Sequence, residues 1–225
     1  MNMKRLAVLN VIILLILVGG GIAAYYYYNQ SVSYIKTDNA QIAGEQVTIA
    51  APANGKLTDW KGSLGKEFNK GEEIGTISAA PSAGAGATPA AAGMSKVKIT
   101  LPKDGTVVQQ SAVEDSFVAA GTPLAHVYDL SSLWVTANVK ETDINDVKVG
   151  QEVDVYVDSY PDNTLSGEVK KIGLATANTF SLLPNSNNTA NYTKVTQVIP
   201  VKISLDSYQG LDIVPGMNVT VRIHK

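Results

Sequence analysis

Two histidines and two pairs of carboxylates are the side chains whose types could support metal or acid–base chemistry. His126 and His224 are far apart in the sequence, and neither lies at metal-ligand spacing from a carboxylate or from the other histidine. Glu72-Glu73 and the Asp143/Asp146 pair occur in patterns that solvated turns and helix faces carry routinely. The sequence therefore predicts no metal site, no cofactor and no catalytic residue.

The composition narrows the function classes further. The chain has 225 residues, 45% of them hydrophobic and 17% charged, which is sufficient for one or two compact domains. It has no cysteine, so disulfides, thiolate nucleophiles and cysteine metal sites are excluded. A formal net charge of −2 gives no basis for nucleic-acid binding. No G-x-S-x-G, P-loop or dinucleotide glycine pattern is present. These observations predict a protein that is not an enzyme.

A duplicated half-motif is the pattern around which the chain is organised. Residues Ile49–Ile77 and Ile99–Val127 align without a gap at an offset of 50 positions, as from Pro52 to Pro102. Each copy has an extended residue before proline, an Asn/Asp-Gly turn, a strand, a glycine turn and a closing strand. The matched turn residues are Pro52, Gly55 and Gly71 in one copy and Pro102, Gly105 and Gly121 in the other. Because neither copy could bury a face alone, we expect both to pack together as one small sandwich.

Between the copies lies Ser78–Lys96, which is rich in Ala, Gly, Pro and Ser and reads as a flexible loop. The half-motif resembles the halves of biotinyl and lipoyl carrier domains, which hold a modifiable lysine on the hairpin between them. The only lysine of this segment is Lys96, in Gly93-Met94-Ser95-Lys96, and it departs from the Ala-Met-Lys-Met type of target. A carrier protein modified on Lys96 therefore remains the alternative function.

The N-terminus has the pattern of a membrane anchor. Lys4 and Arg5 precede the apolar run Leu6–Ala24, whose 19 residues would give a helix about 28 Å long. Tyr25–Tyr28 follow where an interfacial aromatic belt would lie. The positive charges predict a cytoplasmic N-terminus and an extracytoplasmic chain. The anchor would use Leu6, Ile12, Leu15, Val18, Tyr25 and Tyr28. A cleaved signal peptide, with small residues at Gly21 and Ala23, is the alternative.

The remaining chain reads as short strands with turns between them. We expect a mainly β protein with four parts: the anchor (1–28), an exit segment and first strand (29–48), a lipoyl-like domain (49–127) and a small antiparallel β-barrel (128–225). Thr142 is a candidate cap for a helical turn, and Pro200 indicates an edge strand or a bulge. The predicted barrel strands include Leu133–Val139, Gln151–Val157, Leu165–Ile172, Lys194–Leu205 and Asn218–Ile223.

A long polar segment, Ala175–Asn191, holds one apolar island. Its residues Phe180, Leu182, Leu183 and Pro184 are candidates for a partner contact, since long loops in compact domains are often functional. The alternative is a loop that plugs the barrel mouth.

Three stretches resemble the membrane fusion proteins, or periplasmic adaptor subunits, of the haemolysin-secretion-protein-D superfamily, and the EmrA-type branch in particular. They are Thr37–Gly44 (TDNAQIAG), Leu133–Thr142 (LWVTANVKET) and Phe180–Pro184 (FSLLP). The resemblance implies a lipoyl-like domain and a barrel, and a subunit of a multidrug efflux system without catalytic residues. It also implies self-association and an inner-membrane transporter as partner: a major-facilitator drug exporter, with an ABC exporter as alternative.

The chain departs from this family between its half-motifs. Family members usually insert a long coiled-coil hairpin there, whereas Ser78–Lys96 has no heptad pattern. A flexible coil of this length spans only about 25 Å. The sequence thus predicts a short adaptor on the cytoplasmic membrane, and a structural wall-associated β protein is a third hypothesis.

Overall fold

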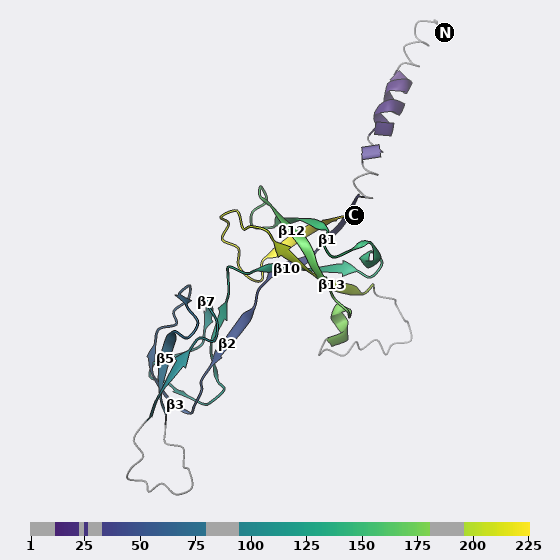
Figure 1. Cartoon of the computed structure of the whole chain (residues 1–225). Helices are drawn as coiled ribbons and strands as arrows, with labels where there is room; N and C mark the ends of the chain where they lie inside the picture. Colours follow the sequence, from purple (N-terminus) through teal and green to yellow (C-terminus); the bar gives the residue numbers. More distant parts are fainter. Residues whose placement is uncertain (1–11, 23–24, 27–32, 80–94, 181–195) are drawn as a thin grey trace, which may run out of the picture. The chain divides into compact units, whose positions relative to one another are not determined.

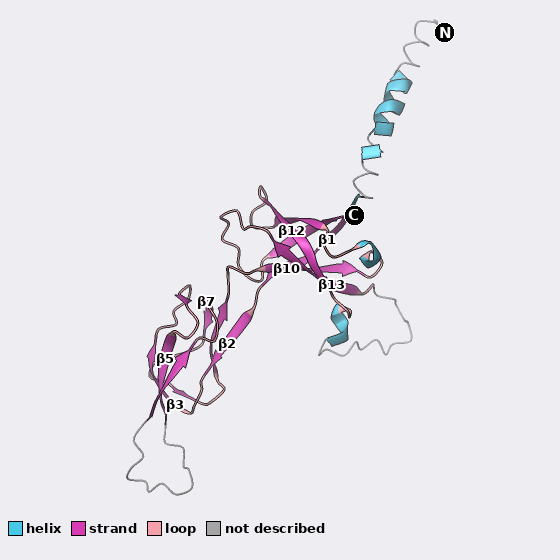
Figure 2. Cartoon of the chain, viewed as in Figure 1, coloured by secondary structure: helices cyan, strands magenta, loops and turns pink. Residues whose placement is uncertain are grey.

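A computed structural model of the whole chain describes all residues except 1–11, 23–24, 27–32, 80–94 and 181–195 (Figure 1). By its contacts the chain divides into two compact units, one of Ala43–Leu133 and one of Met1–Ile42 with Trp134–Lys225. Strands are the main regular element of both units (Figure 2). This agrees with the mainly β class that the sequence predicts.

The first unit is a sandwich of two four-stranded sheets. One sheet has the order β2-β9-β7-β4 and the other the order β6-β5-β3-β8. Each sheet takes two strands from each half-motif, so the halves interlock instead of forming one sheet apiece. The strands are β2 (Gln46–Ala50), β3 (Gly55–Trp60), β4 (Glu67–Phe68), β5 (Glu73–Ala79), β6 (Ser95–Thr100), β7 (Gly105–Gln110), β8 (Phe117–Val118) and β9 (Pro123–Tyr128).

Hydrogen bonds between the halves repeat at the same offset as the sequence. The N–H of Gly71 donates to the carbonyl of Leu101 at 2.7 Å, and the N–H of Gly121 donates to the carbonyl of Ala51 at 2.8 Å. Both glycines have left-handed φ angles, 82° and 84°, in which a glycine is unstrained. The matched glycine turns therefore fasten each half to the other.

The Asn/Asp-Gly turns make a second matched pair of bonds. The side chain of Asn54 accepts a bond from the N–H of Ala120 at 2.8 Å, and that of Asp104 accepts one from Lys70 at 2.6 Å. In the first turn the glycine is required by space, because a Cβ on Gly55 would lie 2.7 Å from Cγ2 of Ile77. A Cβ on Gly105 would likewise lie 2.6 Å from Cγ1 of Val127.

The apolar positions that the alignment pairs are buried between the two sheets, as predicted. Leu57 and Val107 are fully buried, as are the later pairs Ile74 with Leu124 and Ile77 with Val127. One pair differs, since Phe68 is buried and Val118 is only partly so. The core contains Ile49, Ala51, Leu57, Phe68, Ile74, Ile77, Ile99, Leu101, Val107, Ala112, Leu124, Ala125 and Val127.

The second unit contains a closed six-stranded barrel of order β1-β10-β13-β12-β11-β14. The sequence placed the barrel after residue 128, but β1 comes from the segment before the sandwich. The elements are β1 (Tyr34–Ala43), β10 (Trp134–Lys140), η1 (Ile144–Asp146), β11 (Glu152–Val157), β12 (Thr164–Ile172), η2 (Ala177–Phe180), β13 (Val198–Leu205) and β14 (Asn218–His224).

Alternating side chains fill the barrel, as the strand patterns predict. Val153, Val155 and Val157 of β11 are buried, and so are Val219, Val221 and Ile223 of β14. Two local predictions are wrong. Thr142 makes no cap bond to η1, because its hydroxyl donates to Asp143. Pro200 lies in β13, which runs between β10 and β12; the irregularity near it is a bulge in β12 between Val169 and Lys171.

A polar cluster joins β1 to β10 where the barrel closes. The register of β1 against β14 shifts between Thr37 and Ala40. There the hydroxyl of Thr37 donates to the carbonyl of Asn138 at 2.9 Å, and the Asn138 amide donates to the Asn39 side chain at 3.1 Å. The stretch Thr37–Gly44, one of the three that resemble the EmrA-type branch, therefore helps to close the barrel.

Candidate functional site

Lys96, the candidate carrier lysine, lies within a strand. It is exposed on β6 and pairs with Ser78 of β5 in a regular antiparallel ladder. A carrier lysine needs the tip of a tight turn, where its long side chain can swing between sites. The ladder position does not provide that geometry.

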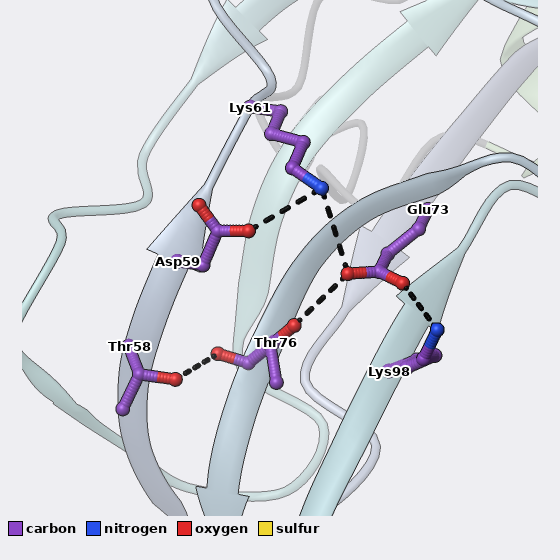
Figure 3. Close-up of polar contacts among 6 residues, drawn as sticks. All are labelled: Thr58, Asp59, Lys61, Glu73, Thr76 and Lys98. Atoms are coloured by element: carbon purple, nitrogen blue, oxygen red, sulfur yellow. Dashed lines mark hydrogen bonds and ion pairs between the residues drawn. The ribbon is translucent and has the colours of Figure 1, made fainter.

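Beside this ladder, a charged network crosses three strands of the β6-β5-β3-β8 sheet (Figure 3). Lys61 lies 3.4 Å from the Asp59 carboxylate and 3.6 Å from that of Glu73. Glu73 also bonds Lys98 at 2.8 Å and accepts from the Thr76 hydroxyl at 3.1 Å. Thr58 joins the same face by donating to the carbonyl of Thr76. The network ties β3, β5 and β6 together near the start of β5 and the end of β3.

The network shifts the pKa values of two of its own side chains, Glu73 and Lys61. The bond from Lys98, aided by Thr76, lowers the pKa of Glu73 below 4.5. The bond to Asp59, with the further attraction of Glu73, raises the pKa of Lys61 above 10.5. Both shifts favour the charged forms, so neither group becomes a proton donor or acceptor near neutral pH. The arrangement supports a structural surface and not acid–base catalysis.

The matched positions of the other sheet carry a different polar cluster. Where the β6-β5-β3-β8 sheet has Thr76 and Lys98, the β2-β9-β7-β4 sheet has His126 and Thr48. Nδ1 of His126 lies 2.7 Å from Nε2 of Gln46 and 3.1 Å from the Thr48 hydroxyl, and the Tyr128 hydroxyl donates to Gln46 at 2.9 Å. The duplicated fold thus carries ion pairs at these positions of one sheet and a hydrogen-bonded polar cluster at the matched positions of the other.

A shallow surface pocket of about 240 Å³ also lies on the sandwich. Several of its polar groups are bonded within the protein: Lys103 pairs with Glu45, and the Asp129 carboxylate accepts from the N–H and hydroxyl of Ser131. Asp104 accepts the Lys70 N–H already described. The pocket residues are Glu45, Val47, Lys70, Lys103, Asp104 and Asp129.

On the barrel, His224 pairs with Asp154 at 3.0 Å and stacks edge-on against Tyr34. Neither His126 nor His224 belongs to a cluster of possible metal ligands among the described residues. Among the described residues, no group of three or more His, Asp or Glu side chains is placed to hold a metal ion.

The candidate anchor is described in part. Residues 12–22 are helical, and among them Ile12, Leu15 and Val18 are 49%, 65% and 53% exposed; Tyr25 is 71% exposed. Leu6 and Tyr28 lie outside the described residues. Over the ranges that the structure describes, no helix combines the length and apolarity needed to cross a membrane.

The candidate partner contact is also described in part. Phe180 ends η2, and Leu182, Leu183 and Pro184 lie outside the described residues. The amide of Asn178 in η2 donates to the side chain of Gln197, and the N–H of Gly173 donates to the carbonyl of Pro200. The preceding segment is thereby held against the start of β13.

Leu174, which the sequence analysis did not single out, is the most exposed large apolar side chain of the barrel at 99%. It follows β12 directly and lies between the Gly173 bond and η2. A lone leucine in the polar stretch GLATANT was the available signal. The sequence predicts the strand end at Ile172, but the exposure of Leu174 beyond it required the structure.

Two domain families match the chain. Residues 45–129 match the barrel-sandwich hybrid domain of YhbJ, and residues 133–223 match the YknX-like beta-barrel domain. These ranges correspond to the sandwich and to the five barrel strands that follow it.

Similar proteins extend this result. The chain is 44% identical over 223 residues to YhbJ of Bacillus subtilis, a provisionally named efflux system component, covering 99% of this chain and 94% of YhbJ. It is 37% identical over 127 residues to the colistin resistance protein EmrA of Acinetobacter baumannii, covering 56% of this chain and 36% of EmrA. The solved structure of the periplasmic adaptor protein EmrA shares the fold, with a TM-score of 0.53 and 13% identity over 86% of this chain and 99% of that one.

Proposed function

The chain belongs to the membrane fusion protein family of efflux adaptors, and from this premise we propose how it acts as the adaptor subunit of an efflux system. The observation that carries the proposal is its similarity to an efflux component over 99% of its length. The sandwich and barrel supply surfaces for assembly, and the described residues hold no cluster of three or more His, Asp or Glu side chains placed to bind a metal ion. An adaptor of this kind acts by holding a transporter and its exit path together.

The N-terminal segment anchors the adaptor in the cytoplasmic membrane as a single span. The support is the apolar run Leu6–Ala24, with Lys4 and Arg5 before it and Tyr25–Tyr28 after it. The exposure of Ile12, Leu15 and Val18 agrees with side chains that face lipid. The rest of the chain is then extracytoplasmic.

The partner is an inner-membrane transporter. The resemblance to the EmrA-type branch favours a major-facilitator drug exporter, with an ABC exporter as alternative. Anchoring supports this partnership because it confines both proteins to one plane. Self-association of the adaptor is part of the same proposal, as the family resemblance implies.

The adaptor is also a short-reach one. Only 15 residues, 80–94, separate the described ends of β5 and β6. Divided into two helical arms, they would extend only about 10 Å beyond the sandwich. A long coiled-coil hairpin therefore does not fit into this chain.

The turn residues of the half-motif have a structural role in this proposal. Gly55 and Gly105 allow close strand contact, and Gly71 and Gly121 allow left-handed turns. Pro52 and Pro102 begin the turns and are exposed. These six turn residues shape the sandwich, whose strands β5 and β6 flank residues 80–94 in the sequence.

Affinity purification from membranes tests the partner class. Full-length protein with a C-terminal tag is solubilised in mild detergent after brief crosslinking, and captured proteins are identified by mass spectrometry. We expect a multi-span exporter to be enriched over a control in which residues 1–28 are replaced by a cleaved signal peptide. Failure to enrich any transporter over this control would contradict the proposal.

Intact-mass spectrometry separates this function from the carrier alternative. The efflux adaptor is expected to have the mass of its sequence, and Lys96→Arg is expected to retain full drug resistance. A stoichiometric biotinyl or lipoyl adduct on Lys96 would favour the carrier.

A further inference from the structure

The barrel has one end at which the chain enters from the N-terminal segment, here called the entry end. Tyr34 at the start of β1 pairs with His224 at the end of β14. Because the neighbouring strands pair antiparallel, β11 and β13 also begin at this end, and β10 and β12 finish there. The backbone bond from the N–H of Lys225 to the carbonyl of Ser33 closes the same end.

Two exposed apolar side chains lie in the loops of the entry end. Leu174, after β12, is 99% exposed, and Val149, before β11, is 63% exposed. The loops belong to adjacent strands, since the N–H of Gly150 donates to the carbonyl of Val169 at 2.9 Å. Both side chains therefore leave apolar surface facing solvent at the same end of the barrel.

The short connection between the N-terminal segment and β1 limits how far the entry end can lie from the membrane. Tyr34 of β1 comes eight positions after Tyr26, a helical residue of the N-terminal segment. Eight residues span at most about 28 Å even when fully extended. If the anchor ends at the lipid headgroups, the start of β1 must lie within that distance of the membrane surface.

We propose that the entry end of the barrel rests on the membrane and inserts Leu174 into the headgroup region. This inference rests on the proposed membrane anchoring. The partner is the lipid surface itself, because an isolated leucine tip needs an apolar layer and not a shaped pocket. Val149 approaches the same surface at a shallower depth.

The charges of the entry end fit a contact through apolar insertion, with electrostatic attraction secondary. Exposed Lys171 and Lys140 flank the β12 side, and Lys170 is paired with Glu168. On the η1 side, Glu141 and Asp143 are acidic, and Asp146 is paired with Lys225. With both signs present, insertion is expected in neutral and in anionic bilayers alike.

The absence of cysteine makes this testable in the intact protein. Leu174→Cys, Phe117→Cys and Val18→Cys each provide a single labelling site for an environment-sensitive fluorophore. Phe117 is the matched control, because it is 84% exposed but belongs to the sandwich. The full chain is reconstituted into vesicles of phosphatidylcholine, with or without phosphatidylglycerol, carrying lipids nitroxide-labelled at shallow or deep positions.

The probe at position 174 is expected to be blue-shifted and quenched about twofold or more by shallow nitroxides, as for a side chain about 5–10 Å into the interface. The probe at 117 is expected to be unquenched, and the probe at 18 to be quenched by deep nitroxides. If 18 is quenched but 174 behaves as 117 does, the membrane contact is wrong and the anchor remains. If 18 is not quenched, the anchor itself is wrong and this contact falls with it.

A second arm addresses the transporter as occupant. The same Leu174→Cys protein is reconstituted with the transporter captured from membranes. Quenching at 174 that needs no transporter supports the lipid contact. Shielding that appears only when the transporter is present would overturn it and assign the tip to the protein partner.

Discussion

Asp115 has a left-handed backbone with φ of 65°. Apart from glycine, which is achiral, only Asn and Asp adopt this conformation with any frequency. Its counterpart in the first half-motif is Gly65, with φ of 78°. The N–H groups of both residues donate across the sandwich at 2.8 Å, Asp115 to Leu57 and Gly65 to Val107. The fold therefore demands this backbone shape in both halves, and the two copies meet the demand with different residues.

Substitutions at Asp115 should separate backbone shape from charge. Asp115→Ala should lower the free energy of unfolding by about 1 kcal/mol, because alanine tolerates the left-handed region poorly. Asp115→Gly should be nearly neutral, since relief of strain offsets the larger freedom of the unfolded chain. The lost Lys56 pair is exposed and worth less than about 1 kcal/mol. Urea unfolding followed by the fluorescence of Trp60 measures both; equal losses would show that charge, not backbone shape, decides.

The network around Glu73 should make the stability of the sandwich depend on pH. The folded pKa of Glu73 is lowered, so its stabilisation is present above the unfolded value and is lost as the pH falls through the folded one. The folded pKa of Lys61 is raised, so its contribution is lost only as the pH rises through that folded value, above 10.5. Glu73→Gln should therefore lower the midpoint of thermal unfolding at neutral pH and leave it nearly unchanged once the pH is below the folded pKa of Glu73.

The control for this prediction is Glu114→Gln, which removes an exposed carboxylate from the second half-motif. Its pH profile should follow that of the wild type. High salt should reduce the difference between Glu73→Gln and wild type, since the groups are partly exposed. A parallel shift of the Glu73→Gln curve at all pH values would contradict an electrostatic origin.

At the scale of elements, β1 completes the closed barrel although it precedes the sandwich in the sequence. It lies between β10 and β14, and it supplies the buried side chains Ile35, Ala40 and Ile42. Without it, two neighbouring strands would expose unpaired edges, and such edges favour aggregation.

Two fragments test this dependence. A fragment of residues 33–225 should be soluble and fold in both units, whereas a fragment of residues 44–225 should lose the barrel and associate. Size-exclusion chromatography and limited proteolysis provide the measurement: in the shorter fragment, residues 44–133 should remain as the protected core. A monomeric 44–225 fragment with a protease-resistant barrel would show that β1 is dispensable.

The sequence predicted the elements whose signal is local. The Asn/Asp-Gly turns, the glycine turns and the alternating valines of β11 and β14 follow from backbone geometry and burial within a few residues. The exchange of strands between the two sheets leaves no local signal in the sequence. It depends on hydrogen bonds that join residues of one half-motif to residues of the other. The same limit explains why β1 was assigned to an exit segment: its partners, β14 and β10, lie far along the chain.

The candidate sites divide in the same way. Gly55 and Gly71 were visible as repeated residues, and the structure gives their reasons as close contact and positive φ. The pairing of Lys61 and Lys98 with Glu73 required the register of β3, β5 and β6. The end of β12 at Ile172 follows from its strand pattern, whereas the 99% exposure of Leu174 just beyond it required the structure.

At the scale of the whole molecule, the chain is a sandwich inserted between the first and second strands of a barrel, after an apolar N-terminal segment. Insertion places the sandwich on two connections, at Ala43 and Leu133, so the barrel and sandwich can each keep a complete core. Nothing in this arrangement among the described residues requires a substrate pocket. In the proposed function its working parts are surfaces: the N-terminal segment and the entry end of the barrel.

Dye efflux from cells tests the central claim, which is that the chain is a membrane-anchored efflux adaptor. A strain lacking the gene is loaded with a fluorescent cationic dye, and the rate of energised efflux is measured after complementation. The full chain should restore wild-type efflux, while a form that carries residues 33–225 behind a cleaved signal peptide should not. Efflux that is unchanged by the deletion, or fully restored by the unanchored form, would contradict the account.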